Sequence, residues 1–192
     1  MNDINLKELT KDDLELVRQW RNSKEVAVYM YTENYISKDQ QIKWFEKINW
    51  DNSKYWVIEY DGKKLGLASI NFIDRTLQSC YWAFYLGDTS VRGAGIGAKV
   101  EYNVLRFVFD ELALNKLRCE VFVTNDKVIK MHEKFGFRRE AYYREHCIKN
   151  NEKLDVVGLA IRGVRKKNHK ITSIVNKGVL FGVDNSGFEM IF

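Results

Sequence analysis

The stretch VRGAGIGAKV, residues 91–100, falls between a predicted strand and a predicted helix. Its glycines, Gly93, Gly95 and Gly97, let backbone N–H groups crowd around an anion, and the start of the following helix adds its dipole. It is not a Walker A loop, because Lys99 is followed by valine, and the G-x-G-x-G spacing differs from the Rossmann fingerprint. We therefore expect a diphosphate-binding loop of another kind, although a flexible loop before a helix is the alternative.

The residues on either side of this loop predict one α/β domain built on a mixed, mostly antiparallel sheet. Alternating apolar residues around an Asp61-Gly62 turn predict a hairpin before the loop, and a second hairpin crosses Asn150-Asn151 near the end. The expected order is β-α-α-β-β-β-α-β-α-β-β, with a parallel step at the glycine-opened helix. Strands are expected at 4–9, 54–60, 64–72, 79–86, 117–123, 139–148 and 153–161, and helices that end near Arg21, Asn49, Asn115 and Phe135.

Length and composition exclude several protein classes. The chain has 192 residues, 45% of them apolar, which suffices for one core without disulfides or a metal. The three cysteines lack C-x-x-C spacing, so we expect ordinary thiols and no metal site. No 18-residue apolar run or signal-like start is present, which predicts a cytoplasmic protein without a membrane span. The net charge of +5 is dispersed, and no aromatic and basic stripe predicts nucleic-acid binding.

Two motifs resemble the GNAT superfamily of N-acetyltransferases over about residues 3–167. One is R-x-x-G-x-G at 92–97, and the other resembles N-x-x-A-x-x-x-Y-x-x-x-G-F, starting at Asn125 with Val128 and His132 in the Ala and Tyr positions. The resemblance implies the GNAT fold, an α/β (α+β) domain with a mixed, mostly antiparallel central sheet of about seven strands flanked by helices. It also implies an acetyl-CoA-dependent N-acetyltransferase. We expect this domain at 1–167 and a C-terminal extension of unknown role at 168–192.

Within the superfamily, the chain most resembles the N-acetyltransferases of pseudaminic acid synthesis. The matching stretches are WRN (20–22), YMY (29–31), VIKMHEKFGF (128–137) and REHCIKNNEKLDVVGLAI (144–161). That resemblance implies acetylation of the 4-amine of UDP-4-amino-4,6-dideoxy-N-acetyl-β-L-altrosamine. Acetyltransferases of ribosomal-protein N-termini and of polyamines share the C-terminal pattern, so these acceptors stay open. A non-catalytic acyl-CoA-binding module is a remote alternative.

The resemblance also assigns an acetyl-CoA site. The strand 81–86 and the strand from Leu117 should splay apart, so that unpaired backbone groups bind pantetheine like an added strand. The loop 91–98 would hold the pyrophosphate. Asn125 would hydrogen-bond the pantetheine arm, although Asn before a helix is also a good N-cap. The expected cofactor-binding residues are Phe84, Tyr85, Leu86, Arg92, Gly93, Ala94, Gly95, Ile96, Gly97, Ala98 and Asn125.

Glu120 is the candidate general base. Transfer to an amine requires a neutral nucleophile. Glu120 sits in LRCEVFV (117–123), a strand that looks buried on both faces, where a carboxylate is costly unless it is paired or useful. It could accept the amine proton through a water, or form a structural pair with Arg118, Lys99 or a tyrosine.

His132 is the candidate general acid. It stands where the family usually has a tyrosine, and its imidazole could donate to the coenzyme A sulfur. A histidine on a helix beside the core can also be merely packed. Tyr142 and Tyr143 on the next strand are the alternative donors.

The N-terminal helices are expected to form the wall that faces acetyl-CoA. Arg21 could meet a nucleotide phosphate, and Met30, Tyr31 and Trp44 could form an apolar platform for uracil and a 6-deoxy sugar. Each of these residues also makes sense as surface or core packing. The same helices carry acids that would suit a polyamine, so the acceptor class stays open, as does a homodimer. Arg144, Glu145 and His146 are expected to shape the acceptor pocket.

Overall fold

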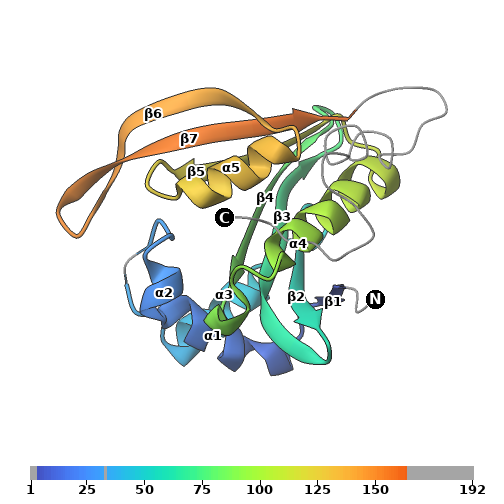
Figure 1. The fold of residues 1–192 in the computed structure, drawn as a ribbon. Helices are drawn as coiled ribbons and strands as arrows, with labels where there is room; N and C mark the ends of the chain where they lie inside the picture. The colour runs from blue at the N-terminus through green and yellow to red at the C-terminus, as the bar shows by residue number, and fades with distance from the viewer. Residues whose placement is uncertain (1–3, 33, 164–192) are drawn as a thin grey trace.

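The computed structural model describes residues 4–32 and 34–163, which form one seven-stranded sheet with helices on both faces (Figure 1). The strand order is β1-β2-β3-β4-β5-β7-β6, and all neighbours are antiparallel except β4 and β5. The expected mixed, mostly antiparallel fold is confirmed. The strands are β1 (Asn5–Glu8), β2 (Lys54–Tyr60), β3 (Lys63–Asp74), β4 (Ser79–Leu86), β5 (Lys116–Phe122), β6 (Arg138–Lys149) and β7 (Glu152–Arg162). The helices are α1 (Leu14–Asn22), α2 (Lys24–Ala27), α3 (Lys38–Glu46), α4 (Ile96–Arg106) and α5 (Asp126–Lys134), with shorter helical turns at Lys11–Asp13, Thr89–Val91 and Phe107–Glu111.

Side-chain hydrogen bonds form capping boxes at the start of the helical turn Lys11–Asp13 and of α3. Asp13 accepts hydrogen bonds from the backbone N–H and the hydroxyl of Thr10, at 2.9 and 2.7 Å. Ser37 and Gln40 form a reciprocal capping box at the start of α3. Each box satisfies backbone donors that a helix start leaves free.

Both predicted hairpin turns are present. Asp61 and Gly62 have φ angles of +50° and +72°, and Asn150 and Asn151 have +48° and +62°. Positive φ at both central residues matches the twist of the flanking strands.

Alternation along the strands builds a core on each face of the sheet. Trp56 and Ile58 of β2 belong to the larger core, which α4 and α5 cover. Val57, on the opposite face of β2, packs in a second cluster with Val17 of α1, and α3 borders that cluster. The sheet is therefore held between α4 and α5 on one side and α1 and α3 on the other (Figure 1).

The sheet opens between β4 and β5. These parallel strands pair at only three positions, from Ser79↔Lys116 to Tyr81↔Arg118. Beyond Tyr81, β4 stays paired with β3 to Leu86, and β5 stays paired with β7 to Phe122. The predicted splay of the two strands is confirmed.

The prediction that β5 is buried on both faces is wrong. Leu117, Cys119 and Val121 are buried, but Arg118 is half-buried and Glu120 is exposed. The reason is the opening of the sheet, since β5 loses its β4 neighbour before it reaches Glu120.

The expected C-terminal extension, 168–192, and the end of the expected domain lie outside the described residues. None of the helices in residues 4–32 and 34–163 is long and apolar enough to cross a membrane.

Candidate active site

The glycine loop ends in a left-handed residue that starts α4. Gly95 is the N-cap of α4 with φ +71°, and a Cβ added to it would meet nothing within 4 Å. The first intrahelical bond runs from the Lys99 N–H to the Gly95 carbonyl. By helix geometry the N–H groups of Ile96, Gly97 and Ala98 then have no intrahelical acceptor. The loop thus presents backbone donors and a helix N-terminus to open space, which suits a diphosphate.

Gly97 lies against the opening of the sheet. A Cβ there would come within 3.2 Å of Met131 Sδ on α5 and 3.4 Å of Phe84 Cζ on β4. Phe84 and Leu86 pack toward the larger core and Tyr85 toward the second cluster. In the described part of the chain no strand pairs with the β5-facing edge of β4 beyond Tyr81, so its backbone can receive an extended pantetheine arm.

Asn125 stands at the start of α5 but does not cap it with its side chain. Its backbone carbonyl accepts from the N–H groups of Val128 and Ile129, at 3.1 and 3.2 Å, and its side chain makes no capping hydrogen bond. Asn125 therefore occupies the N-cap position through its backbone, but its side chain does not act as a cap. Its half-exposed amide remains a candidate for the pantetheine arm.

His132 is packed in the core and paired with a carboxylate. It is 2% exposed, and its Nδ1 lies 2.9 Å from Oε1 of Glu101 on α4, which is fully buried. The His132 ring also packs against Trp82 and Phe137, at centroid distances of 5.3 and 5.1 Å. Burial raises the pKa of the Glu101 carboxyl, and the hydrogen bond with His132 opposes that rise.

Glu101 is a site residue that the sequence analysis missed. The signal was present, since Glu101 interrupts a helical stripe of apolar positions that includes Val100, Val104 and Val108. An unpaired acid on such a face is costly and calls for a partner.

Glu120 meets Tyr31 across the opening of the sheet. The Tyr31 hydroxyl donates to Glu120 Oε2 at 2.8 Å. This contact is the pairing with a tyrosine that the sequence analysis gave as an alternative for Glu120. Burial raises the pKa of Tyr31, and the hydrogen bond to Glu120 raises it further. The Tyr31 ring packs edge-on against Phe122 at 5.3 Å and lies 5.9 Å from the His146 ring. His146 in turn lies 5.0 Å from Tyr143.

The other expected acceptor residues separate into two places. The Met30 carbonyl accepts from Lys149 Nζ at 2.6 Å, beside Tyr31. Trp44 instead packs edge-on against Tyr55 at 5.2 Å and borders the second core cluster. Trp44 thus has the packing role that was the alternative expectation for it. Tyr31 lies beside β5 and β6 and not beside Trp44.

Arg21 lines a small cavity between α1 and the segment that precedes α3. The cavity has a volume of about 120 Å³ and is lined by Arg21, Asn22, Ala27, Thr32, Asn34, Tyr35 and Ile36. Arg21 Nη2 donates to the Thr32 hydroxyl at 2.9 Å. Burial lowers the pKa of the Arg21 guanidinium. Within the described residues its hydrogen-bond acceptor is the neutral Thr32 hydroxyl.

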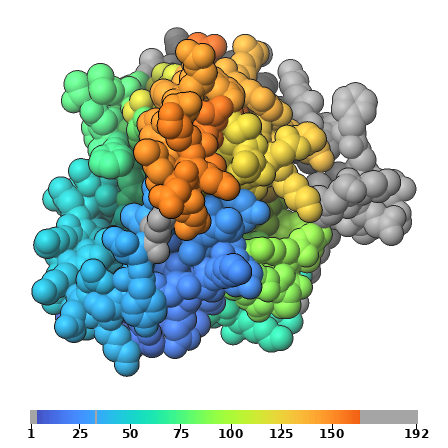
Figure 2. All heavy atoms as spheres, turned by 90° about the vertical axis from the view of Figure 1, so that its left-hand side faces the viewer, coloured from blue at the N-terminus to red at the C-terminus, as the bar shows by residue number. Residues whose placement is uncertain are grey.

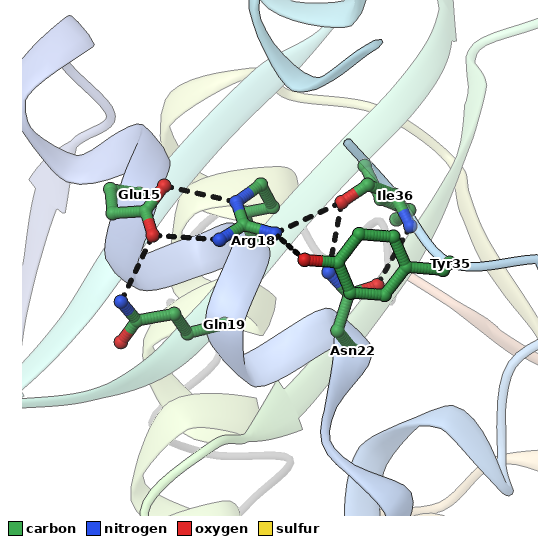
Figure 3. A network of polar contacts seen from close by, with 6 residues as sticks. All are labelled: Glu15, Arg18, Gln19, Asn22, Tyr35 and Ile36. Atoms are coloured by element: carbon green, nitrogen blue, oxygen red, sulfur yellow. Dashed lines mark hydrogen bonds and ion pairs between the residues drawn. The ribbon is translucent and has the colours of Figure 1, made fainter. Parts of the chain in front are cut away.

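A polar network holds this cavity in shape (Figure 3). Arg18 donates to both carboxylate oxygens of Glu15, at 2.9 and 2.7 Å, and to the Tyr35 hydroxyl at 2.8 Å. Asn22 exchanges two hydrogen bonds with the backbone of Ile36, at 2.9 and 2.8 Å. Helix α1 is therefore fixed to residues 35 and 36.

The sequence pattern described as "Acetyltransferase (GNAT) domain" matches residues 3–138. This chain belongs to the GNAT acetyltransferase family. Acetyltransferase PseH of Campylobacter jejuni subsp. jejuni (serotype O:23/36) is 28% identical over 134 residues, which cover 69% of this chain and 82% of that protein. Spermidine N(1)-acetyltransferase of Vibrio cholerae is 24% identical over 155 residues, 80% of this chain and 89% of that protein.

A solved structure supports the fold of this GNAT chain. The spermidine N-acetyltransferase of Vibrio cholerae, solved with CoA and spermine, aligns with a TM-score of 0.78 at 24% identity and covers 83% of this chain and 95% of that one. The GNAT chain is an acetyl-CoA-dependent N-acetyltransferase.

The site fits the two halves of acetyl-CoA. The N–H groups at 96–98 suit the pyrophosphate, and the free edge of β4 suits the amide-bearing pantetheine arm. Acetyl-CoA supplies a reactive thioester and a thiol leaving group. The residues near the opening then divide into Glu120 with Tyr31 on one side and His132 with Glu101 on the other.

Proposed function

We propose that this GNAT enzyme acetylates the 4-amino group of a UDP-linked 4-amino-4,6-dideoxy sugar. The half-buried guanidinium of Arg21 in its cavity carries the proposal: among residues 4–32 and 34–163 its hydrogen-bond acceptor is the Thr32 hydroxyl, and a guanidinium favours an anionic group such as a nucleotide phosphate. The similarity to PseH supports the same acceptor.

Two acids of the N-terminal helices are already paired within the fold and do not favour a polyamine. Asp13 is paired with Lys64 at 2.6 Å, and Glu15 is paired with Arg18 at 2.7 Å. These carboxylates are therefore already neutralised within the fold. No carboxylate is among the described residues that line the Arg21 cavity.

A polyamine or a protein N-terminus is the second candidate acceptor. The observation in its favour is the exposed Glu120 carboxylate beside the rings of Tyr31 and His146, since aromatic faces and a carboxylate attract a cationic amine. The similarity to the spermidine acetyltransferases supports it as well.

We propose that Glu120 and His132 move the two protons of the reaction. Glu120 accepts the amine proton through a water, and its exposed position gives that water access. His132 holds the proton for the departing thiolate, and Glu101 orients its ring through Nδ1. Of the alternative donors, Tyr142 already donates to Asp155 at 2.5 Å, and Tyr143 lies beside His146.

The proposal is tested at Arg21. Arg21→Ala should raise the KM for the nucleotide sugar about 10- to 100-fold, the range expected for one lost charge-assisted contact to phosphate, with the affinity for acetyl-CoA unchanged. Arg139→Ala is the control, because Arg139 is exposed and paired with Glu133 on the far side of the sheet. An unchanged KM in Arg21→Ala would contradict the proposed phosphate contact.

A further inference from the structure

Lys149 is a buried cation whose three donors are all used. It ends β6 and is 6% exposed. Its Nζ donates to the backbone carbonyls of Ala27, Val28 and Met30, at 2.5, 3.2 and 2.6 Å. An ammonium group has three N–H donors, so these contacts satisfy it. Burying an ammonium without such partners would be costly.

The carbonyls that Lys149 binds lie at the end of α2 and in the residues that follow it. The Ala27 carbonyl also accepts from the Met30 N–H at 3.1 Å, and a cation at this end of a helix interacts favourably with its carbonyls. The contacts join segments about 120 residues apart. In Figure 2 the β6–β7 hairpin (orange) lies directly on the N-terminal part of the chain (blue). Residues 27–32 are called the acceptor segment below.

The acceptor segment contacts both Lys149 and Glu120. Tyr31 follows Met30 directly, and its hydroxyl reaches Glu120 at 2.8 Å. Lys149 Nζ also lies 5.8 Å from the centroid of Phe122, against which the Tyr31 ring packs. The position of Tyr31 therefore depends on where Lys149 holds the backbone on its N-terminal side.

We infer that Lys149 is a positioning residue for the amine acceptor. It docks the acceptor segment on the tip of the β6–β7 hairpin and so holds Tyr31 against Glu120. The acceptor pocket is then complete only when the two ends of the domain are joined. The inference rests on the proposed function in one respect, that the acceptor amine binds beside Tyr31 and Glu120.

This role affects the acceptor and not acetyl-CoA. The acetyl-CoA site is formed by the edge of β4 and the loop 92–98. Among residues 4–32 and 34–163, the contacts of Lys149 are with the acceptor segment and Phe122. A variant without the ammonium should thus change the kinetics with the acceptor and leave the affinity for acetyl-CoA unchanged.

The experiment compares Lys149→Met with Lys116→Met. Methionine keeps most of the side-chain length and removes the donors, and Lys116 is a sheet lysine paired with Glu140 away from the acceptor segment. Lys149→Met should lower kcat/KM for the acceptor about 10- to 100-fold, as expected when a binding group loses its fixed geometry. Calorimetry should show the wild-type affinity for acetyl-CoA. Lys116→Met should keep both parameters.

A purely structural lysine would give a different result. Lys149→Met would then melt at a lower temperature but keep the wild-type kcat/KM for the acceptor at a temperature where it is folded, and this would overturn the inference. If Lys149→Met does not fold, Lys149→Gln, which keeps an amide donor, is measured against the same criterion.

A double-mutant cycle with Tyr31→Phe gives a second readout. If Lys149 acts through Tyr31, the double variant should lose little more acceptor kcat/KM than Lys149→Met alone. Fully additive losses would contradict this route. The assay uses whichever amine the enzyme turns over fastest. If a polyamine is turned over fastest, the proposed sugar acceptor is refuted. The comparison of Lys149→Met with the wild type then still tests the inference about Lys149.

Discussion

His132 and Glu101 are each buried with the other as polar partner. In the resemblance to the GNAT motif, His132 occupies the position of the tyrosine acid. We predict that His132→Phe lowers kcat by a factor of about 10² to 10⁴, as for a lost general acid. It also leaves the Glu101 carboxyl buried without its partner, which should lower the melting temperature.

Replacing both partners separates the catalytic effect from the structural one. His132→Tyr alone restores the usual acid, but the tyrosine must fit between Trp82 and Phe137 beside a buried carboxyl. The double variant Glu101→Leu/His132→Tyr should therefore be more stable and more active than His132→Tyr. If His132→Phe keeps full turnover between pH 6 and 9, the histidine only packs.

Glu15 gives a pH prediction with a defined direction. The hydrogen bond with Arg18 lowers the pKa of Glu15 to about 2, from an ordinary value of 4.5. A carboxylate with a lowered pKa stabilises the fold above its unfolded pKa, and this contribution is lost as the pH falls from about 5 to 2. The melting temperature of Glu15→Gln should thus depend less on pH in this window than that of the wild type. An identical pH dependence in both proteins would refute the prediction. Glu8→Gln on β1 serves as the control.

At the scale of elements, the glycine loop can be tested with a matched pair of substitutions. Gly95 and Gly62 have φ angles of +71° and +72°, and a Cβ on either would meet nothing within 4 Å. Valine should therefore cause similar backbone strain at both sites, of the order of 1–2 kcal/mol. Only Gly95→Val should weaken acetyl-CoA binding in calorimetry, because only Gly95 lies in the loop at the start of α4. Equal affinity in the two variants would place the pyrophosphate elsewhere.

The elements show which features the sequence could predict. The hairpin turns and the glycine-opened helix depend on residues a few positions apart, and these predictions are confirmed. The exposure of Glu120 depends on where β4 and β5 part, which local patterns do not contain. The contacts of Lys149 join residues about 120 positions apart along the chain, so local patterns could not predict them either.

At the scale of the whole molecule, the candidate site lies where the sheet opens and the two ends of the domain meet. Helix α4 brings the backbone donors, β4 and β5 diverge to leave an edge, and the β6–β7 hairpin closes onto the acceptor segment (Figure 1). This arrangement would keep the proposed acetyl-CoA site separate from the proposed acceptor wall. Variation in that wall can therefore change the acceptor without changing the donor.

The acceptor itself is tested most directly by measuring coenzyme A release from acetyl-CoA with three kinds of amine. They are a UDP-linked 4-amino-4,6-dideoxy sugar, spermidine and an N-terminal peptide. The charge at Arg21 predicts the highest kcat/KM for the sugar nucleotide, with the product acetylated at the 4-amine by mass spectrometry and NMR. Turnover of spermidine or the peptide at a higher kcat/KM than the sugar nucleotide would contradict the proposed function.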